Sequence, residues 1–275
     1  MNEYCQRAIS AMNPQPEGAD AALQARTAII LKHLHAMIDE LQPTDKELYA
    51  VMGWLNQVGK DNDFIMLCDV MGLTMRTVDL THDRADATRA NVEGPFAKED
   101  VPVFDNPVEF ARGGEPGQRV ELRGKVTSAA TGQPVAGALF EIWQTNHAGK
   151  YENEDSAQPP DNFRGKFHTA ADGTYSISTI LPGPYEIGSL HSAVGQAMTK
   201  LGRKRFRAAH LHYRIGKGGF RPLTSQIYFE GLPDNPGDCI FSARPDNMTS
   251  LKPHPQRPGQ LLGEFDIRLA REDAQ

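Results

Sequence analysis

The chain has 275 residues, of which 39% are hydrophobic and 23% are charged, and its formal net charge is −6. This composition is ordinary for a globular protein and excludes a fibrous repeat or a chain that is disordered throughout. The one basic cluster, Arg203-Lys204-Arg205 with Arg207, is short, so it favours an anionic ligand over nucleic acid.

The three cysteines, Cys5, Cys68 and Cys239, are far apart in the sequence and odd in number. They support neither a disulfide framework nor a cysteine-based zinc site, and they favour a reducing, cytoplasmic location. No apolar stretch approaches the roughly 20 residues of a membrane-spanning helix, and the N-terminus lacks the apolar segment of a signal peptide. We therefore expect no membrane span.

Roughly the first 95 residues have the periodicity of amphipathic helices. Apolar residues recur at steps of three and four between Leu23 and Leu41, and Pro43 ends this first predicted helix. Thr44-Asp45-Lys46-Glu47 is typical of a capping box and begins a second helix, which Gly59 is placed to end. A third, strongly apolar helix is predicted from Asp63 to Leu80.

After Pro95, short β-rich runs alternate with Gly, Pro and Asp-Gly turns, and no helix is predicted between them. This pattern indicates an antiparallel β-sandwich rather than a parallel α/β sheet. We predict an α+β fold with a helical N-terminal domain, residues 1–105, followed by a β-sandwich domain, residues 106–275. The predicted strands cover residues 118–126, 138–145, 173–178, 209–215, 223–229 and 262–269.

A His-x-His pair lies inside the strand-like run from Arg207 to Tyr213. Side chains alternate between the two faces of a strand, so His210 and His212 share one side. Two interpretations are open, because imidazole is a common metal ligand and is also found in hydrogen-bonded pairs within sheets.

Two tyrosines lie in predicted loops. Tyr151 follows the Gly149-Lys150 turn, and Tyr185 follows Leu181-Pro182-Gly183-Pro184. Each tyrosine alone is typical of a half-buried side chain with its hydroxyl in water. Together with the two histidines they form a Tyr₂His₂ set, and because phenolate is a hard anionic oxygen donor, this set indicates non-haem Fe(III). The acidic loop from Glu152 to Asp161 is interpreted as a solvated face.

In these motifs the chain resembles the intradiol ring-cleaving dioxygenases of the catechol and hydroxyquinol 1,2-dioxygenase type. The likeness runs from about Asp63 to Arg244, and its motifs follow the family's order. They are Leu67-Cys68-Asp69-Val70-Met71-Gly72, Val92-Glu93-Gly94-Pro95-Phe96, Ile142-Trp143-Gln144 with Gly149-Lys150-Tyr151, Leu181-Pro182-Gly183-Pro184-Tyr185, Arg207-Ala208-Ala209-His210-Leu211-His212, and Leu223-Thr224-Ser225-Gln226.

The resemblance implies one Fe(III) per subunit, held by Tyr151, Tyr185, His210 and His212. The resemblance also implies that Arg207 and Gln226 line the pocket near the metal as catalytic residues, together with Tyr185, which stands where the family's displaceable tyrosine lies. A guanidinium cannot lose its proton, so Arg207 suits the stabilisation of negative charge on a substrate ring. The implied substrates are a small aromatic diol and O₂, both atoms of which enter the ring as it opens between the hydroxylated carbons.

The family's pocket walls correspond to nine residues here. Asp69-Val70 and Trp143-Gln144 are similar to hydroxyquinol and chlorocatechol enzymes. The Asp69 carboxylate can accept a hydrogen bond from a third ring hydroxyl, which favours conversion of hydroxyquinol to 3-hydroxy-cis,cis-muconate, the tautomer of maleylacetate. Val92-Glu93-Gly94-Pro95 is similar to the catechol and chlorocatechol branches, so a catechol or chlorocatechol 1,2-dioxygenase is the alternative. The nine wall positions are Met66, Asp69, Val70, Val92, Gly94, Pro95, Phe96, Cys239 and Ile240.

The helical N-terminal domain argues against the protocatechuate type and, by resemblance, implies a homodimer whose helices hold a phospholipid at the interface. The sequence also allows a different class of protein, a β-sandwich module without catalytic activity. Gly124-Lys125-Val126 and Asp172-Gly173-Thr174-Tyr175 occur in prealbumin-like β-sandwiches that bind without catalysis. The series of two tyrosines, Arg207 and two histidines distinguishes the two classes, because a binding module does not need it.

Overall fold

The computed structural model describes residues 1–12, 18–84, 86–111 and 114–272. The chain divides into two compact units, residues 1–60 and 61–275. The division at residue 105, which separates a dimerising from a catalytic domain, stays a prediction. None of the described helices is long and apolar enough to cross a membrane. Cys5, Cys68 and Cys239 are free cysteines in the structure.

The first unit is helical, as predicted, and consists of α1 (Glu3–Ser10), α2 (Ala21–Leu41) and α3 (Asp45–Lys60). The Asp20 side chain caps α2 by accepting a hydrogen bond from the Leu23 amide at 2.9 Å. The capping box of α3 is confirmed, because the amide of Thr44 donates to the Glu47 carboxylate at 2.8 Å and the amide of Glu47 donates to the Thr44 hydroxyl at 3.3 Å. Helix α1 was not predicted.

The single third helix predicted from Asp63 to Leu80 is wrong, because the structure has two helices there, α4 (Phe64–Val70) and α5 (Leu73–His82). Gly72 adopts a left-handed conformation with φ 75°, which interrupts the helix. The apolar period runs through this break, so periodicity alone did not reveal it. A further helix, α6 (Ala193–Lys200), was also not predicted.

The second unit contains thirteen strands among its described residues, and each of the six predicted runs overlaps at least one of them. The last run is two strands, separated at Phe265-Asp266. The strands are β1 (Val108–Glu109), β2 (Arg119–Ser128), β3 (Leu139–Gln144), β4 (Arg164–His168), β5 (Thr174–Ile180), β6 (Tyr185–Glu186), β7 (Phe206–Arg207), β8 (His210–Gly216), β9 (Leu223–Phe229), β10 (Met248–Thr249), β11 (Leu251–Pro253), β12 (Leu261–Glu264) and β13 (Ile267–Leu269).

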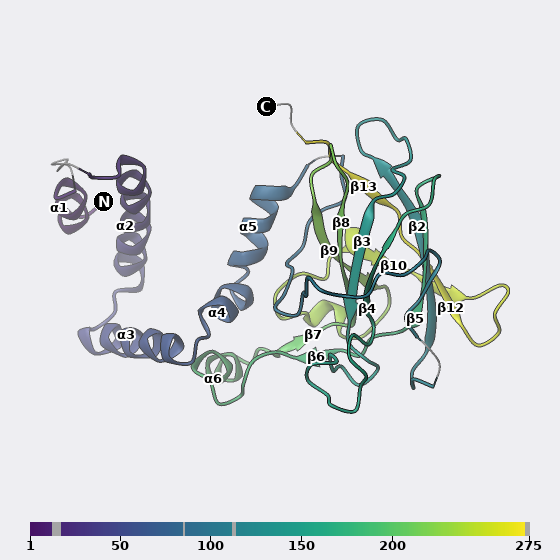
Figure 1. Ribbon diagram of the computed structural model, residues 1–275. Helices are drawn as coiled ribbons and strands as arrows, with labels where there is room; N and C mark the ends of the chain where they lie inside the picture. Colours follow the sequence, from purple (N-terminus) through teal and green to yellow (C-terminus); the bar gives the residue numbers. More distant parts are fainter. Residues whose placement is uncertain (13–17, 85, 112–113, 273–275) are drawn as a thin grey trace. The chain divides into compact units, whose positions relative to one another are not determined.

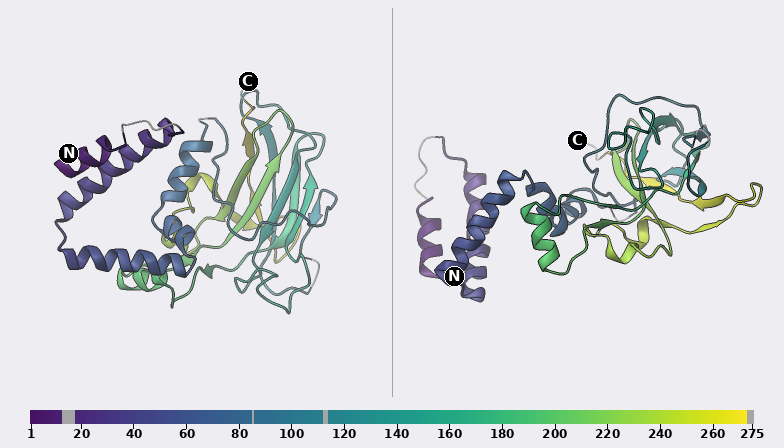
Figure 2. Two further views of the ribbon diagram at one scale, coloured as in Figure 1. Left: turned by 60° about the vertical axis from the view of Figure 1, so that its left-hand side comes forward. Right: turned by 90° about the horizontal axis from the view of Figure 1, so that it is seen from below.

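Two sheets form the sandwich (Figures 1 and 2). One has the order β1-β5-β2-β12-β11, with β13 also paired to β2, and the other has the order β10-β9-β8-β3-β4. The pairs of long strands, β2 with β5 and β8 with both β3 and β9, are antiparallel as predicted. Short strands add parallel pairs, β1 with β5, β10 with β9, and β12 and β13 with β2, so the sheets are mixed at their margins.

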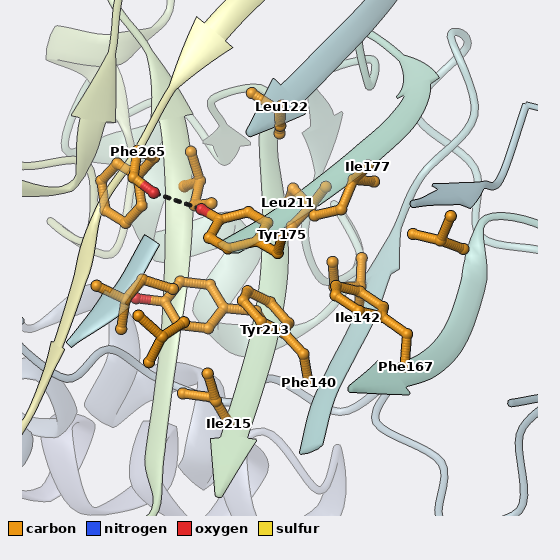
Figure 3. Close-up of a cluster of buried hydrophobic side chains, with 14 of the residues drawn as sticks. Leu122, Phe140, Ile142, Phe167, Tyr175, Ile177, Leu211, Tyr213, Ile215 and Phe265 are labelled. Carbon is orange, nitrogen blue, oxygen red and sulfur yellow. Dashed lines mark hydrogen bonds between the residues drawn. The ribbon is translucent and has the colours of Figure 1, made fainter. Parts of the chain in front are cut away.

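Side chains from both sheets fill the space between them (Figure 3). Phe140 of β3 stacks on Phe167 of β4 with ring centroids 5.0 Å apart, and it also contacts Tyr175 of β5 from the opposite sheet. The buried Tyr175 hydroxyl donates a hydrogen bond to the Phe265 carbonyl, so its polar end is satisfied. This core fixes β3, β8 and β9, the three strands that carry the site described next.

Candidate active site

The two histidines lie side by side on β8. His210 pairs with Tyr228 of β9 and His212 with both Gln226 of β9 and Trp143 of β3, so the histidines occupy the same face of a central strand. Both are buried, and their Nε2 atoms are 3.0 Å apart. The period of two therefore brings the pair together as the sequence predicted.

The two tyrosines reach the histidines from separate segments, Tyr151 from a loop as predicted and Tyr185 from a short strand rather than the predicted loop. The Asn146 side chain accepts hydrogen bonds from the amides of Ala148 and Lys150 at 2.9 and 3.0 Å, which closes the turn before Tyr151. Tyr185 belongs to β6, where it pairs with Arg207 of β7. The ring centroids are 5.7 Å apart for Tyr151 and Tyr185, 5.6 Å for Tyr185 and His210, and 4.7 Å for the two histidines. All four predicted ligands thus form one cluster.

Three of the four rings are stacked on a further aromatic ring. Trp143 stacks on His212 at 5.0 Å, Tyr228 on His210 at 5.1 Å and Phe96 on Tyr151 at 4.3 Å. His210 Nδ1 lies 2.6 Å from the Ala208 carbonyl, which can only accept, so Nδ1 carries the proton and Nε2 keeps its lone pair. The ring orientations are therefore fixed before any ligand binds.

The protonation of the cluster fits a metal site. Burial, with the charge of Arg207, lowers the pKa of His210 well below its ordinary value, and burial and His210 do the same for His212. Both imidazoles are therefore neutral, the form that binds metals. Burial, with the neighbouring Tyr185 phenol, raises the pKa of Tyr151 well above its ordinary value, so ionising this phenol requires a nearby cation.

The geometry and the donor set also fit a metal. The two Nε2 atoms lie 3.0 Å apart, so both imidazoles would be able to bind a single ion. The Tyr151 hydroxyl is buried and makes no hydrogen bond of ordinary geometry to the described residues. Over the described ranges, no group of three or more His, Cys, Asp or Glu side chains is placed to hold a metal ion.

A cavity of about 780 Å³ opens beside Tyr185 and Arg207. Helix α5 contributes one face to it, with Thr74, Val78 and His82 at intervals of four residues. Val70 and Cys239 are buried but do not line the cavity. The other seven expected wall residues do line it, namely Met66, Asp69, Val92, Gly94, Pro95, Phe96 and Ile240.

Arg207 is buried at the cavity edge in a network that the sequence only partly revealed. Its Nη2 donates to the Gln226 side-chain oxygen at 2.8 Å, and Gln226 in turn donates to the Val92 carbonyl at 2.8 Å. Gln226 is buried behind Arg207 and does not line the cavity, so its predicted place in the pocket lining is wrong. The network also contains Tyr228, Asp238 and Ser242, which were not predicted. Tyr228 follows Gln226 by two residues in one strand, the same spacing that revealed the histidine pair.

The basic cluster before the histidines is largely internal. Arg203 donates to the carbonyls of Val70 and Cys239, and Arg205 donates to the carbonyls of Ile187 and Gly188 and to the Glu186 carboxylate. These two arginines therefore stabilise the loops around the cavity. Of the three arginines, Arg207 alone lines the cavity, so it is the member of the cluster that can contact a ligand there.

The acidic loop is also not a simple solvated face. Glu152, next to Tyr151, is buried and forms a two-point ion pair with Arg164 of β4, at 3.1 Å from Nε and 2.9 Å from Nη2. Arg164 also donates to the Phe96 carbonyl, and Lys98 pairs with Glu152. This group ties the loop that carries Phe96 to the strand after Tyr151, which holds the two stacked rings together.

The family model described as "Catechol dioxygenase N terminus" matches residues 20–89, and the model described as "Dioxygenase" matches residues 92–271. The hydroxyquinol 1,2-dioxygenase of Rhodococcus opacus is 32% identical over 273 residues, which are 92% of this chain and 89% of the relative. Catechol 1,2-dioxygenase 2 of Acinetobacter lwoffii is 32% identical over 222 residues, 78% of this chain and 80% of the relative.

The fold agrees with these relatives. The crystal structure of hydroxyquinol 1,2-dioxygenase from Pseudomonas putida DLL-E4 superposes with a TM-score of 0.90 over 98% of each chain, at 24% identity. The helical N-terminal unit and the sandwich lie within the regions that the two family models match, and these regions together cover most of the chain. The chain therefore belongs to the intradiol ring-cleaving dioxygenases, enzymes of the catechol and hydroxyquinol 1,2-dioxygenase type.

Proposed function

We propose that Tyr151, Tyr185, His210 and His212 hold one ferric ion per subunit and that the enzyme cleaves hydroxyquinol to 3-hydroxy-cis,cis-muconate. The reaction adds both atoms of O₂ to the ring, so that one carbon–carbon bond becomes two carboxylates. The observation that carries the proposal is the cluster of two phenols and two neutral imidazoles beside a cavity of about 780 Å³ that Tyr185 and Arg207 line.

Ferric iron, when bound, supplies a Lewis acid that can bind the two adjacent ring oxygens. The residues of the chain prepare the substrate. Tyr185 lines the cavity and, as a phenolate, can take up a proton from a ring hydroxyl at its own oxygen. Arg207 places a permanent positive charge at the cavity edge, which stabilises negative charge on the ring. The apolar wall, including Val92, Pro95 and Ile240, excludes water from the ring.

The preference for hydroxyquinol rests on Asp69. This residue of α4 lines the cavity, and its Oδ1 is buried without a hydrogen-bond partner among the described residues. An unpaired buried acceptor is costly, and a third hydroxyl on the substrate ring supplies the missing donor. Catechol and chlorocatechol lack that hydroxyl and are the alternative substrates, in keeping with the mixture of relatives.

The first test is a visible absorption spectrum with an iron assay on the purified protein, before and after anaerobic addition of a diol. Tyrosinate bound to ferric iron gives a charge-transfer band, and we expect this band to shift when hydroxyquinol binds. We expect Tyr151→Phe and Tyr185→Phe each to change the band. A colourless protein that stays colourless after iron reconstitution would contradict the proposal and favour the non-catalytic, prealbumin-like binding module.

The second test compares kcat/KM for hydroxyquinol, catechol and chlorocatechols. The proposal requires hydroxyquinol to give the highest value. A value for catechol tenfold above the others would assign the enzyme to the catechol branch while leaving the iron site intact.

A homodimer with a phospholipid at its interface and a cytoplasmic location are part of the same proposal. None of the residues of α2 is buried within the chain, and apolar side chains such as Ile29, Ile30 and Leu34 are exposed. A second copy and a lipid would cover such surfaces. Light scattering that gives a monomer at micromolar concentration would contradict the dimer, and organic extraction followed by mass spectrometry tests for the lipid.

A further inference from the structure

Asp238 is a buried carboxylate that lies behind Arg207. Its side chain is 2% exposed, and it is absent from the residues that line the cavity. Oδ1 accepts a hydrogen bond from Arg207 Nε at 2.8 Å. Oδ2 accepts from the Ser242 hydroxyl at 2.6 Å and from the amides of Ser242 and Ala243 at 3.1 and 3.0 Å. Both oxygens of this carboxylate thus accept hydrogen bonds, and Oδ1 accepts only from Arg207.

The donors of Arg207 are divided between the network and the cavity. Nε donates to Asp238, and Nη2 donates to the side chains of Gln226, Tyr228 and Ser242 at 2.7–2.9 Å. Within the described part of the chain, Nη1 makes no hydrogen bond. The guanidinium is planar, so two fixed nitrogens determine the direction of the third. Nη1 is therefore the donor that remains for a ligand in the cavity.

The same carboxylate also shapes the cavity wall. Its bonds to the amides of Ser242 and Ala243 close the turn that carries Ile240, a wall residue. Tyr228 adds a link to the ligand cluster, because its hydroxyl lies 3.1 Å from Asp238 while its ring stacks on His210. Asp238 thus connects the charged group at the cavity edge, one wall residue and the support of one histidine.

We propose that Asp238 is a positioning residue for the ring-cleaving reaction, which holds the Arg207 guanidinium so that Nη1 faces the substrate. This inference rests on the proposed function, since Arg207 matters only if a diol binds in the cavity. The alternative is that Asp238 neutralises a buried charge and maintains the fold, with no influence on the direction of Nη1. The two roles differ in what happens to Arg207 when Asp238 is replaced.

The first test needs neither iron nor substrate. In protein labelled with ¹⁵N-arginine, Arg207→Lys identifies the Arg207 Nε–H signal by its loss. We expect that proton to exchange slowly with water in the wild type and about tenfold or more faster in Asp238→Ala, because its acceptor is gone. Glu121→Ala is the matched control, since it also removes a buried, hydrogen-bonded carboxylate but lies away from the cavity. Unchanged exchange in Asp238→Ala would overturn the proposal.

The second test is a double-mutant cycle on kcat/KM. We expect Asp238→Ala to lower the value about 10- to 100-fold, mainly through kcat, with the Glu121→Ala control close to wild type. If Asp238 acts through Arg207, then Arg207→Gln combined with Asp238→Ala is no slower than Arg207→Gln alone. Losses that multiply in the double variant would show that Asp238 acts independently of Arg207 and would overturn the proposal.

A conservative variant covers the case in which Asp238→Ala does not fold. Asp238→Asn keeps the shape of the side chain but places an amide NH₂ against the hydrogen-bond donors of Ser242 and Ala243. We therefore expect the same changes in Nε–H exchange and in kcat/KM, but smaller ones. Wild-type kinetics and exchange in this variant would overturn the proposal. A wild-type protein that cleaves no diol contradicts the proposed function instead, while the exchange measurement still decides whether Asp238 fixes Arg207.

Discussion

Gly183 lies with its backbone directly against Gly149, so that a Cβ on Gly183 would overlap the Gly149 amide nitrogen and the His147 carbonyl oxygen. The Gly183 amide also donates to the Asn146 carbonyl at 2.8 Å. One glycine precedes Tyr151 by two residues and the other precedes Tyr185 by two. The distance between the two phenols therefore depends on a backbone contact that no side chain can occupy.

We predict that Gly183→Ala separates the two tyrosine loops and weakens metal binding. Overpacking of this kind costs about 1–3 kcal/mol of unfolding free energy. We expect the iron content per subunit to fall by a larger fraction than the unfolding free energy does. Iron content and the charge-transfer band measure the effect, together with urea unfolding. Gly218→Ala, where a Cβ meets open space, is the control and is expected to behave as the wild type. Full iron content in Gly183→Ala would contradict the prediction.

The buried pair of Glu152 and Arg164 is predicted to be worth far more than the neighbouring pair of Glu152 and Lys98. Arg164→Met leaves Glu152 without its two-point partner in a buried site, which costs about 3–5 kcal/mol. Lys98 is 40% exposed, so Lys98→Met costs less than about 1 kcal/mol. Urea unfolding at pH 7 measures both. Equal costs for the two variants would show that the burial of Arg164 contributes nothing.

Glu121 makes stability depend on pH. Burial alone would raise its pKa, but hydrogen bonds from His254 and Ser176 and the charge of Arg257 lower the pKa below its ordinary value. A carboxylate with a lowered pKa in the folded state stabilises the fold above its unfolded pKa, and this stability is lost as pH falls through the folded pKa. Glu121→Gln therefore destabilises the protein by about 1–3 kcal/mol at pH 7.

We expect the difference in unfolding free energy between wild type and Glu121→Gln to shrink as the pH is lowered from 5 to about 3. Denaturant unfolding at several pH values measures it. The site described above takes no part, so diol cleavage by Glu121→Gln at pH 7 should match the wild type. A difference that grows towards low pH would reverse the assigned sign.

Asp69 is predicted to distinguish the substrates. Asp69→Leu removes the acceptor for a third ring hydroxyl, so kcat/KM for hydroxyquinol should fall about 10- to 100-fold while catechol is affected little. Met66→Leu, which changes the wall without changing its polarity, is the control and should alter both substrates alike. An equal loss for both diols in Asp69→Leu would mean that this carboxylate does not recognise the third hydroxyl.

Local sequence patterns predicted what depends on local geometry. The spacing of His210 and His212 was enough to place their rings together, because alternation along a strand does not depend on the rest of the fold. The capping box at Thr44 located the start of α3 for the same reason. Gly72, in contrast, was a visible signal of the break between α4 and α5 that the continuous apolar period concealed.

Long-range pairings could not be predicted in this way. Asp238 and Ser242 meet Arg207 only because β9 and the turn after it fold back beside β8, and strand register is set by the whole sandwich. Arg164 lies on β4, a strand that the sequence did not reveal, so its pairing with Glu152 was also missed. The sequence predicted most of the residues around the cavity. It did not predict the buried residues that hydrogen-bond to them and hold them in place.

The aromatic rings stacked on the Tyr/His cluster also predict that its four side chains do not rotate with equal ease. Tyr151, His210 and His212 each have a flat neighbour, so none of these rings can turn unless Phe96, Tyr228 or Trp143 moves as well. Tyr185 is half-buried, and its two ring contacts are edge-on or tilted. Rotation of Tyr185 therefore does not require a stacked neighbour to move, whereas its three companions can turn only in concert with the rings packed against them.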